Sequence, residues 1–130
     1  MSFLHFTTSG ATHRRDLGRA RARLAELCRL EAGWHDGDGA AMDAAAVHAA
    51  ENFLDMRPSQ ASASRIYPTD AGGVLFEFES RGWDYSVEFG AGGSVQFYGI
   101  EINGTKEIAP QSFMRLNQEF FGLFDQHARI

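Results

Sequence analysis

Two neighbouring stretches of the chain alternate between apolar and polar residues. They cover residues 74–79 and residues 83–89, and a period of two is typical of a half-buried β-strand. With Arg81 and Gly82 as a two-residue hairpin loop, three apolar pairs fall on one face: Phe78 with Tyr85, Phe76 with Val87, and Val74 with Phe89. A slip of one residue would move all six side chains to the other face, so this register is strongly specified.

Further strands are predicted on both sides of this hairpin. Residues 65–69 favour a short edge strand, because Pro68 has no N–H to donate. On the other side, residues 90–93 are rich in glycine and predict a turn. A three-residue loop there would place Val87 opposite Val95 and Tyr85 opposite Phe97.

The apolar phase changes after Phe97. A bulge at Gly99 would bring Ile100 and Ile102 into line with the earlier residues. Asn103-Gly104 is a strong turn signal that would place Lys106 opposite Glu101. Residues 105–108 are then expected to form a short last strand.

Helical spacing of apolar residues occurs in three segments. The first covers residues 12–31, with Thr12 as N-cap, and the second covers residues 44–56, with Asp43 as N-cap. The third follows Pro110, with Ser112 as N-cap. The apolar stripe of the first helix is Leu17, Ala20, Leu24, Leu27 and Cys28, and that of the third is Phe113, Leu116, Phe120, Leu123 and Phe124.

Residues 1–11 and 59–64 lie outside these patterns. Ser9-Gly10 breaks the first stretch, which is expected to be an arm or an edge strand, and the second is expected to be a polar linker. The order of elements predicts an α+β fold with two N-terminal helices, an antiparallel meander of about four strands and a C-terminal helix. The helices are expected to pack on one face of the sheet. Residues 1–130 suit a single domain.

The composition indicates in which cellular compartment the protein is expected. Cys28 is the only cysteine, so no disulfide within the chain is predicted, and a cytoplasmic location follows. On the apolar stripe of its helix, Cys28 is expected to be a small buried hydrophobe. The N-terminus lacks the features of a signal peptide, and no apolar run approaches 18 residues, so no membrane association is expected.

Charge is unevenly distributed along a chain whose net charge is −5. Residues 14–31 hold six arginines, at positions 14, 15, 19, 21, 23 and 29, against three acidic residues. Arg15, Arg19 and Arg23 would lie opposite the apolar stripe and could contact phosphates or an acidic protein. Aromatic residues do not interleave with these arginines, so direct nucleic-acid binding is the less favoured interpretation.

The stretch Gly33-Trp34-His35-Asp36-Gly37-Asp38-Gly39-Ala40 has the highest density of unusual residue types. Its three glycines permit positive φ angles in a tight loop. Asp36 and Asp38 suggest a calcium loop, but the acids that an EF-hand requires at later positions are absent. The favoured interpretation is a turn capped by Asp36 and Asp38 and anchored by Trp34, with no metal and no cofactor. The alternative is a metal-dependent enzyme that uses His35, Asp36, Asp38 and His48.

The rest of the sequence has no nucleophile motif, phosphate loop or dinucleotide fingerprint. Its other notable feature is the polar face of the predicted sheet. Acids alternate there with core residues, and Glu79 falls directly opposite Asp84, where like charges repel. This face could be a solvated surface or a platform for a basic partner: Glu77, Glu79, Asp84, Glu88 and Tyr98.

Several motifs together resemble a group of small bacterial proteins. Members read Gly-Trp-x-Asp-Gly-Glu/Asp-Gly, then Tyr/Phe-Pro-Thr-Pro-Glu-Gly-Gly-Val, Glu-Trp and a Trp-x-Ser-x-Glu strand. In this chain the matching residues are 33–40, Phe53-Leu54, 66–69, 72–74, Glu77, Trp83 and 86–88. The chain differs at Asp70-Ala71, where the group has Pro-Glu, and at Phe78, where the group has Trp. The group often occurs in mobile or accessory genomic regions.

The resemblance implies an accessory, immunity, antitoxin-like or counter-defence role and transfers no catalytic residue. We therefore expect a non-enzymatic protein that binds another protein. That partner would be a toxin or a nucleic-acid-binding defence complex, as for an antitoxin, an immunity protein or an anti-CRISPR inhibitor. A homodimer is also compatible with the sequence.

Overall fold

The computed structural model describes residues 2–128, with side chains described from residue 14 onward. Its element order is α1 (Ser2–Cys28), α2 (Ala44–Met56), α3 (Gln60–Ala63), β1 (Arg65–Pro68), β2 (Val74–Ser80), β3 (Trp83–Phe89), β4 (Val95–Glu101), β5 (Glu107–Phe113) and α4 (Gln118–Ala128). A 3₁₀ turn, η1 (Ala91–Gly93), joins β3 to β4. The predicted α+β class is confirmed.

The sheet is an antiparallel meander with the strands in sequence order. It has five strands, where about four were expected. β1 is an edge strand, as predicted. The register of the β2–β3 hairpin is confirmed, with Phe78 opposite Tyr85 and Phe76 opposite Val87. The next predicted register is wrong: Val87 lies opposite Phe97, and Phe89 lies opposite Val95. The 3₁₀ turn lengthens the loop to residues 90–94 and shifts the pairing.

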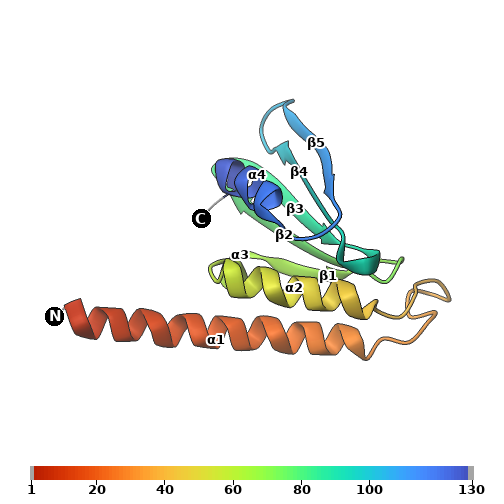
Figure 1. Ribbon diagram of the computed structural model, residues 1–130, viewed down its shortest axis with the longest axis horizontal. Helices are drawn as coiled ribbons and strands as arrows, with labels where there is room; N and C mark the ends of the chain where they lie inside the picture. Colours follow the sequence, from red (N-terminus) through yellow and green to blue (C-terminus); the bar gives the residue numbers. More distant parts are fainter. Residues whose placement is uncertain (1, 129–130) are drawn as a thin grey trace.

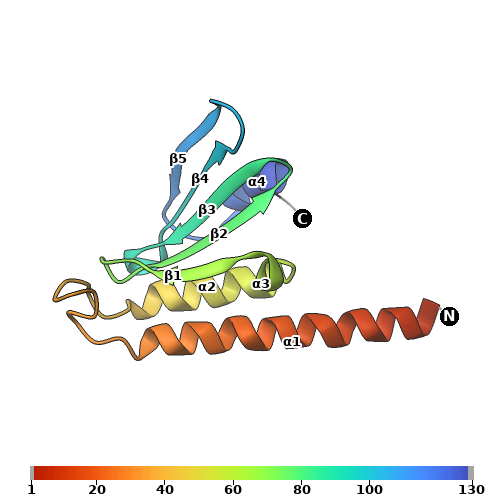
Figure 2. The ribbon, with the colours of Figure 1, turned by 180° about the vertical axis from the view of Figure 1, so that it is seen from behind.

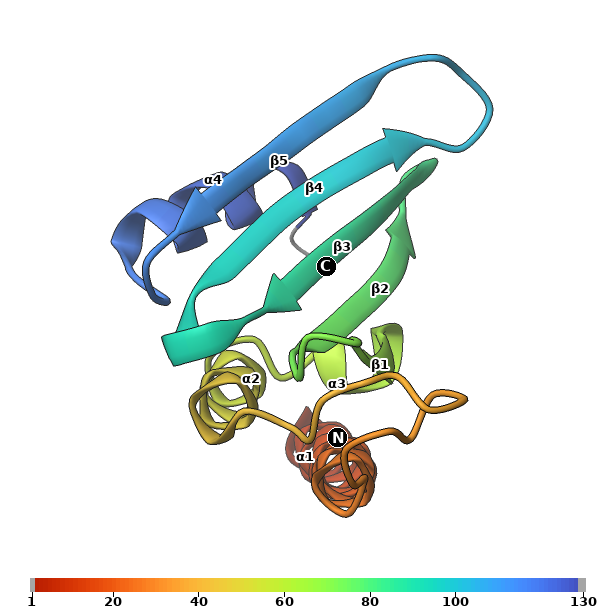
Figure 3. The same cartoon turned by 90° about the vertical axis from the view of Figure 1, so that its right-hand side faces the viewer.

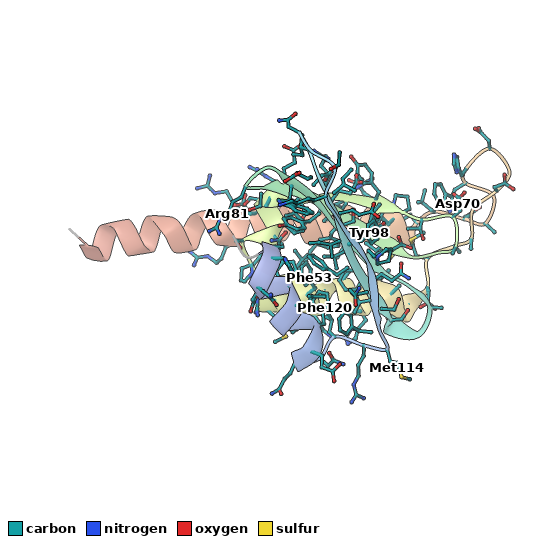
Figure 4. The ribbon with its side chains drawn as sticks, turned by 90° about the horizontal axis from the view of Figure 1, so that it is seen from above. Phe53, Asp70, Arg81, Tyr98, Met114 and Phe120 are labelled. Carbon is teal, nitrogen blue, oxygen red and sulfur yellow. The ribbon has the colours of Figure 1, made fainter. Side chains whose placement is uncertain are left out.

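The helices lie on one side of the sheet (Figure 1). α2 and α4 supply the apolar side chains that face the strands, while α1 packs against α2, α3 and β1. Phe53 of α2 is fully buried at the centre and contacts the rings of four other residues: Phe76, Phe89, Phe120 and Phe124. Phe53 and Phe120 lie in the interior of the molecule (Figure 4). The large aromatic area buried there is the main source of stability.

The first helix differs from its prediction at both ends. α1 runs through residues 2–11, which are neither an arm nor an edge strand, and it continues through Thr12, so the helix does not begin there. One serine and one glycine cost too little helix propensity to stop it. Its N-terminal part extends past α2 (Figure 2). The helix ends at Cys28, which is exposed rather than buried. Leu24 and Leu27 occupy the buried stripe, and Cys28 lies one position beyond it.

Three corrections concern the second half of the chain. Residues 59–64 contain the short helix α3 instead of a linker. Ile100 and Ile102 remain exposed, since the irregularity near Gly99 lies between β4 and β5 and leaves the β3–β4 pairing in phase. Pro110 and Ser112 belong to β5, so they neither lead into nor cap a helix. β5 is an edge strand, which tolerates the missing N–H of a proline.

The last helix therefore begins at Gln118, later than predicted. Asn117 takes the capping role, because its side-chain oxygen accepts a hydrogen bond from the Phe120 backbone N–H at 2.9 Å. For α2 the predicted cap is confirmed: the Asp43 carboxylate accepts from the Ala46 N–H at 3.1 Å. Asp43 also accepts from the Gly92 N–H at 3.2 Å and so ties α2 to the β3–β4 turn.

Candidate functional site

The glycine loop is a miniature hairpin. His35 and Asp38 exchange two backbone hydrogen bonds of 2.8 Å. The two residues between them, Asp36 and Gly37, have φ angles of 50° and 94°. Positive φ at both central positions is typical of a type I′ turn, for which Asp-Gly is a favoured sequence. Asp36 supplies the positive φ of the turn, but among the described side chains neither Asp36 nor Asp38 makes a hydrogen bond, so the predicted capping by their carboxylates is not observed.

Trp34 holds this hairpin together through contacts within the loop. Its indole N–H donates to the Ala40 carbonyl at 2.8 Å. The indole also lies against Gly39, where a Cβ atom would come within 2.7 Å of the ring. The imidazole of His35 stacks with the indole of Trp34, with 5.5 Å between the ring centroids. The ring of Trp34 is partly buried and closes the loop on itself.

A second loop, which the sequence did not pair with the first, docks against it. His35 Nδ1 lies 2.8 Å from an Asp70 carboxylate oxygen, and the Ala40 N–H donates to the Asp70 carbonyl at 2.7 Å. The Asp43 N–H donates to the Gly72 carbonyl at 2.8 Å. The glycine loop and the loop that contains Asp70 and Gly72 therefore meet at one corner of the molecule. No local signal in the sequence could have joined positions so far apart in the chain.

This corner does not gather a set of metal ligands. His35 and Asp70 are both well exposed, with side-chain exposed fractions of 58% and 60%. His48 lies apart from them, on the exposed face of α2. Among the residues with described side chains, no group of three or more His, Cys, Asp or Glu could hold a metal ion. The four residues of the metal-enzyme alternative are therefore not brought together.

The opposite face of the sheet has no cover. Strands β2–β5 lie in front in Figure 3, with α4 behind them and α1 and α2 seen end-on beside the sheet. Of the helices in the described chain, none crosses this face. We call it the open face. Its polar side chains form rows across the strands, and the predicted residues lie there together: Glu77, Glu79, Asp84, Glu88 and Tyr98.

The carboxylates of the open face lack basic partners. Glu79 and Asp84 are directly opposite one another in the β2–β3 pair, as predicted. Arg65 lies opposite Glu77, yet within the described side chains none of the four acids makes an ion pair. One carboxylate oxygen of Asp84 is buried and has no hydrogen-bond partner among the described residues. A buried carboxylate oxygen without a hydrogen-bond partner destabilises the fold. A hydrogen-bond donor from another molecule would therefore bind favourably to Asp84.

Tyr98 contacts one of these acids at the centre of the open face. Its hydroxyl group donates to Glu88 at 3.2 Å. Burial raises the pKa of Tyr98, and the charge of Glu88 raises it further, since a nearby carboxylate disfavours the phenolate. Tyr98 therefore remains a neutral hydrogen-bond donor, which holds the Glu88 carboxylate in place.

Both edges of the sheet carry features that disfavour pairing with another strand. α1 covers β1, and the Arg23 guanidinium donates to the Ile66 carbonyl at 3.0 Å. β5 carries Pro110 and is irregularly paired next to Tyr98. A covering helix and a proline in an irregular strand are both typical of protected sheet edges. The face of the sheet is thus more accessible to a partner than its edges.

The arginines of α1 are partly engaged within the chain. Arg23 also contacts Glu26 at 3.1 Å, Arg21 pairs with Asp55, and Arg19 lies 4.0 Å from Asp16. Arg15 is exposed, and the described side chains include no ion-pair partner for it. This pairing lowers the net positive charge that the helix presents to a phosphate backbone.

The comparisons with known proteins add no assignment: no family model, curated protein or solved structure matches this chain. None of the described helices is both long enough and apolar enough to cross a membrane.

Proposed function

We propose that this chain is a non-enzymatic accessory protein that binds another protein through the open face of its sheet. The observation that carries the proposal is a set of sheet carboxylates with no helix over them and no ion-pair partner among the described side chains. Such a surface attracts a basic partner by electrostatic complementarity.

The chemistry of the face suits a partner that handles nucleic acids. Proteins that bind a phosphate backbone present clustered lysine and arginine side chains. Acids spaced along neighbouring strands can dock onto the same basic surface and exclude the nucleic acid from it. This supports an antitoxin, immunity or anti-CRISPR type of role.

Affinity capture from the native host tests the proposal when the wild type is compared with two charge-reversed variants. The first, E79K/E88K, changes the open face. The matched control, E31K/E119K, reverses two exposed acids that lie off the sheet. We expect the wild type and the control to retain one identified partner, and the face variant to lose it.

The binding should also weaken as salt is raised, because exposed charges are screened over about 8 Å at physiological ionic strength. Folding of each variant is checked by thermal unfolding. Capture that is equal for all three proteins, or no capture by the wild type, would overturn the proposal.

A further inference from the structure

The N-terminal part of α1 lies outside the packed body of the molecule. Among the described side chains of α1, Leu17 is the first apolar one that packs against the core. Arg14 and Arg15, which precede it, are exposed. Beyond the end of α2, no other element of the described chain lies beside the helix (Figure 1, Figure 2). We call residues 2–15 the overhang.

The overhang combines positive charge with apolar residues. Its sequence has two arginines and two histidines, and it has no aspartate or glutamate. Phe3 and Phe6 fall at the same helical spacing as Leu17 and Ala20, with which the apolar stripe of α1 begins to pack on the core. In the body, α2, α3 and β1 cover this stripe. The overhang has no such cover within one copy of the described chain.

The open face has the complementary character. Its carboxylates make no ion pair among the described side chains, although Glu79 and Asp84 lie directly opposite one another. Ile100 belongs to the same face, because it pairs with Asp84, and this apolar residue is 55% exposed. A basic segment with apolar residues therefore matches the open face in charge and in the apolar area that binding would bury.

The dimensions of the two elements also agree. The overhang is helical throughout and spans about 20 Å, while the five strands of the sheet span about 19 Å from first to last. The overhang is thus long enough to cross the open face. It cannot reach the open face of its own chain, because α1 is one unbroken helix on the other side of the sheet (Figure 1, Figure 3).

We propose that the overhang of one copy binds the open face of a second copy of this chain. Every copy carries both elements, so the contact needs no other molecule. The inference goes beyond the proposed function, in which the open face binds a different protein. It adds a form of regulation, since self-association covers the open face and the partner must displace the overhang.

Sedimentation equilibrium of the full chain tests the proposal. We expect wild type to self-associate in low salt and to dissociate as salt is raised, because exposed charges are screened over about 8 Å at physiological ionic strength. R14E/R15E in the overhang and E79K/E88K on the open face should each weaken self-association at least about tenfold, since like charges then face one another. The matched control, E31K/E119K, should behave like wild type.

A mixture of the two variants gives the decisive measurement. R14E/R15E keeps an intact open face and E79K/E88K keeps an intact overhang, so the equimolar mixture should associate again. Recovery also shows that both variants are folded. If charge reversal destabilises either variant, R14Q/R15Q and E79Q/E88Q give the same comparison with milder changes. The proposal is overturned if wild type stays monomeric in low salt at about 1 mM protein, or if the mixture fails to associate.

Partner capture with the same variants separates this proposal from the proposed function. R14E/R15E should capture the partner at least as well as wild type, because its open face is uncovered; loss of capture would contradict the proposal. A monomeric wild type whose capture depends on Glu79 and Glu88 would keep the proposed function and exclude self-association. Association that the mixture restores, combined with capture that is indifferent to E79K/E88K, would keep self-association and exclude the proposed function.

Discussion

Gly37 and Gly39 lie in the same hairpin and offer a matched pair of substitutions. Their φ angles are 94° and 93°, so alanine is strained to a similar degree at both positions. Their surroundings differ. A Cβ atom at Gly37 meets nothing within 4 Å, whereas one at Gly39 would lie 2.7 Å from the indole of Trp34. G37A therefore measures the backbone term alone, and G39A adds the displacement of Trp34.

The magnitudes follow from these contacts. Positive φ costs a non-glycine residue about 1–3 kcal/mol, and both variants incur that loss of unfolding free energy. Only G39A also forces the indole away from its hydrogen bond to the Ala40 carbonyl, a bond that contributes about 0.5–1.5 kcal/mol. Crowding of a packed ring typically costs about 1–3 kcal/mol. We expect G39A to be less stable than G37A by about 1–3 kcal/mol.

Urea unfolding followed by far-ultraviolet circular dichroism measures the difference. W34A supplies the control, because removal of the indole removes the atoms that lie nearest to the new methyl group. In the W34A background the extra cost of G39A should vanish, which makes the two positions equivalent. Equal destabilisation by G37A and G39A in the wild type, or a difference that persists without Trp34, would refute the assigned role of the indole.

Four further predictions concern the core, a helix cap, the open face and the dependence of stability on pH. Phe53→Ala removes a fully buried ring and should lower the free energy of unfolding by about 3–5 kcal/mol in urea denaturation. Asp43→Ala removes the acceptor of two backbone N–H groups and should cost about 0.5–2 kcal/mol in the same assay, while Asp43→Asn should retain most of the stability. Because the Glu88 carboxylate raises the pKa of Tyr98, E88Q should lower that pKa in a titration of phenolate absorbance. The pKa values of Tyr85 and Tyr98 are raised in the folded state, so the unfolded chain loses these protons first, near pH 10. This stabilisation is complete below about pH 10 and should be lost as pH rises through the folded-state pKa values; stability that increases there would contradict the assignment.

The part of the candidate site that lies on the β2–β3 hairpin was predictable from the sequence. Glu77, Glu79, Asp84 and Glu88 alternate with core residues, and the two-residue turn specifies their pairing. The sequence did not reveal that β5 continues this face. Ser112 had been assigned as the cap of a helix, and it lies opposite Gln96 only because β5 extends to Phe113.

The C-terminal error has an identifiable physical cause. Phe113 and Leu116 continue the helical spacing of Phe120 and Phe124, so periodicity alone extends the last helix too far. Pro110 reinforced this error because it suits the region before a helix. In the fold Pro110 lies in β5, an edge strand that has no neighbouring strand on its outer side. The pairing of β5 with β4 outweighs the local preference of this segment.

The sequence by itself determined the features that depend on neighbours in the chain. These are the alternation of β2 and β3, the Asp-Gly turn of the glycine loop, the indole that anchors it, and the cap of α2. Each is set by residues a few positions apart, so its energy can be judged from local pattern. The tertiary structure alone decided that Asp70 meets His35 and that Cys28 is exposed. Those outcomes depend on packing between distant segments, where the burial of Phe53 and its neighbours overrides local preference.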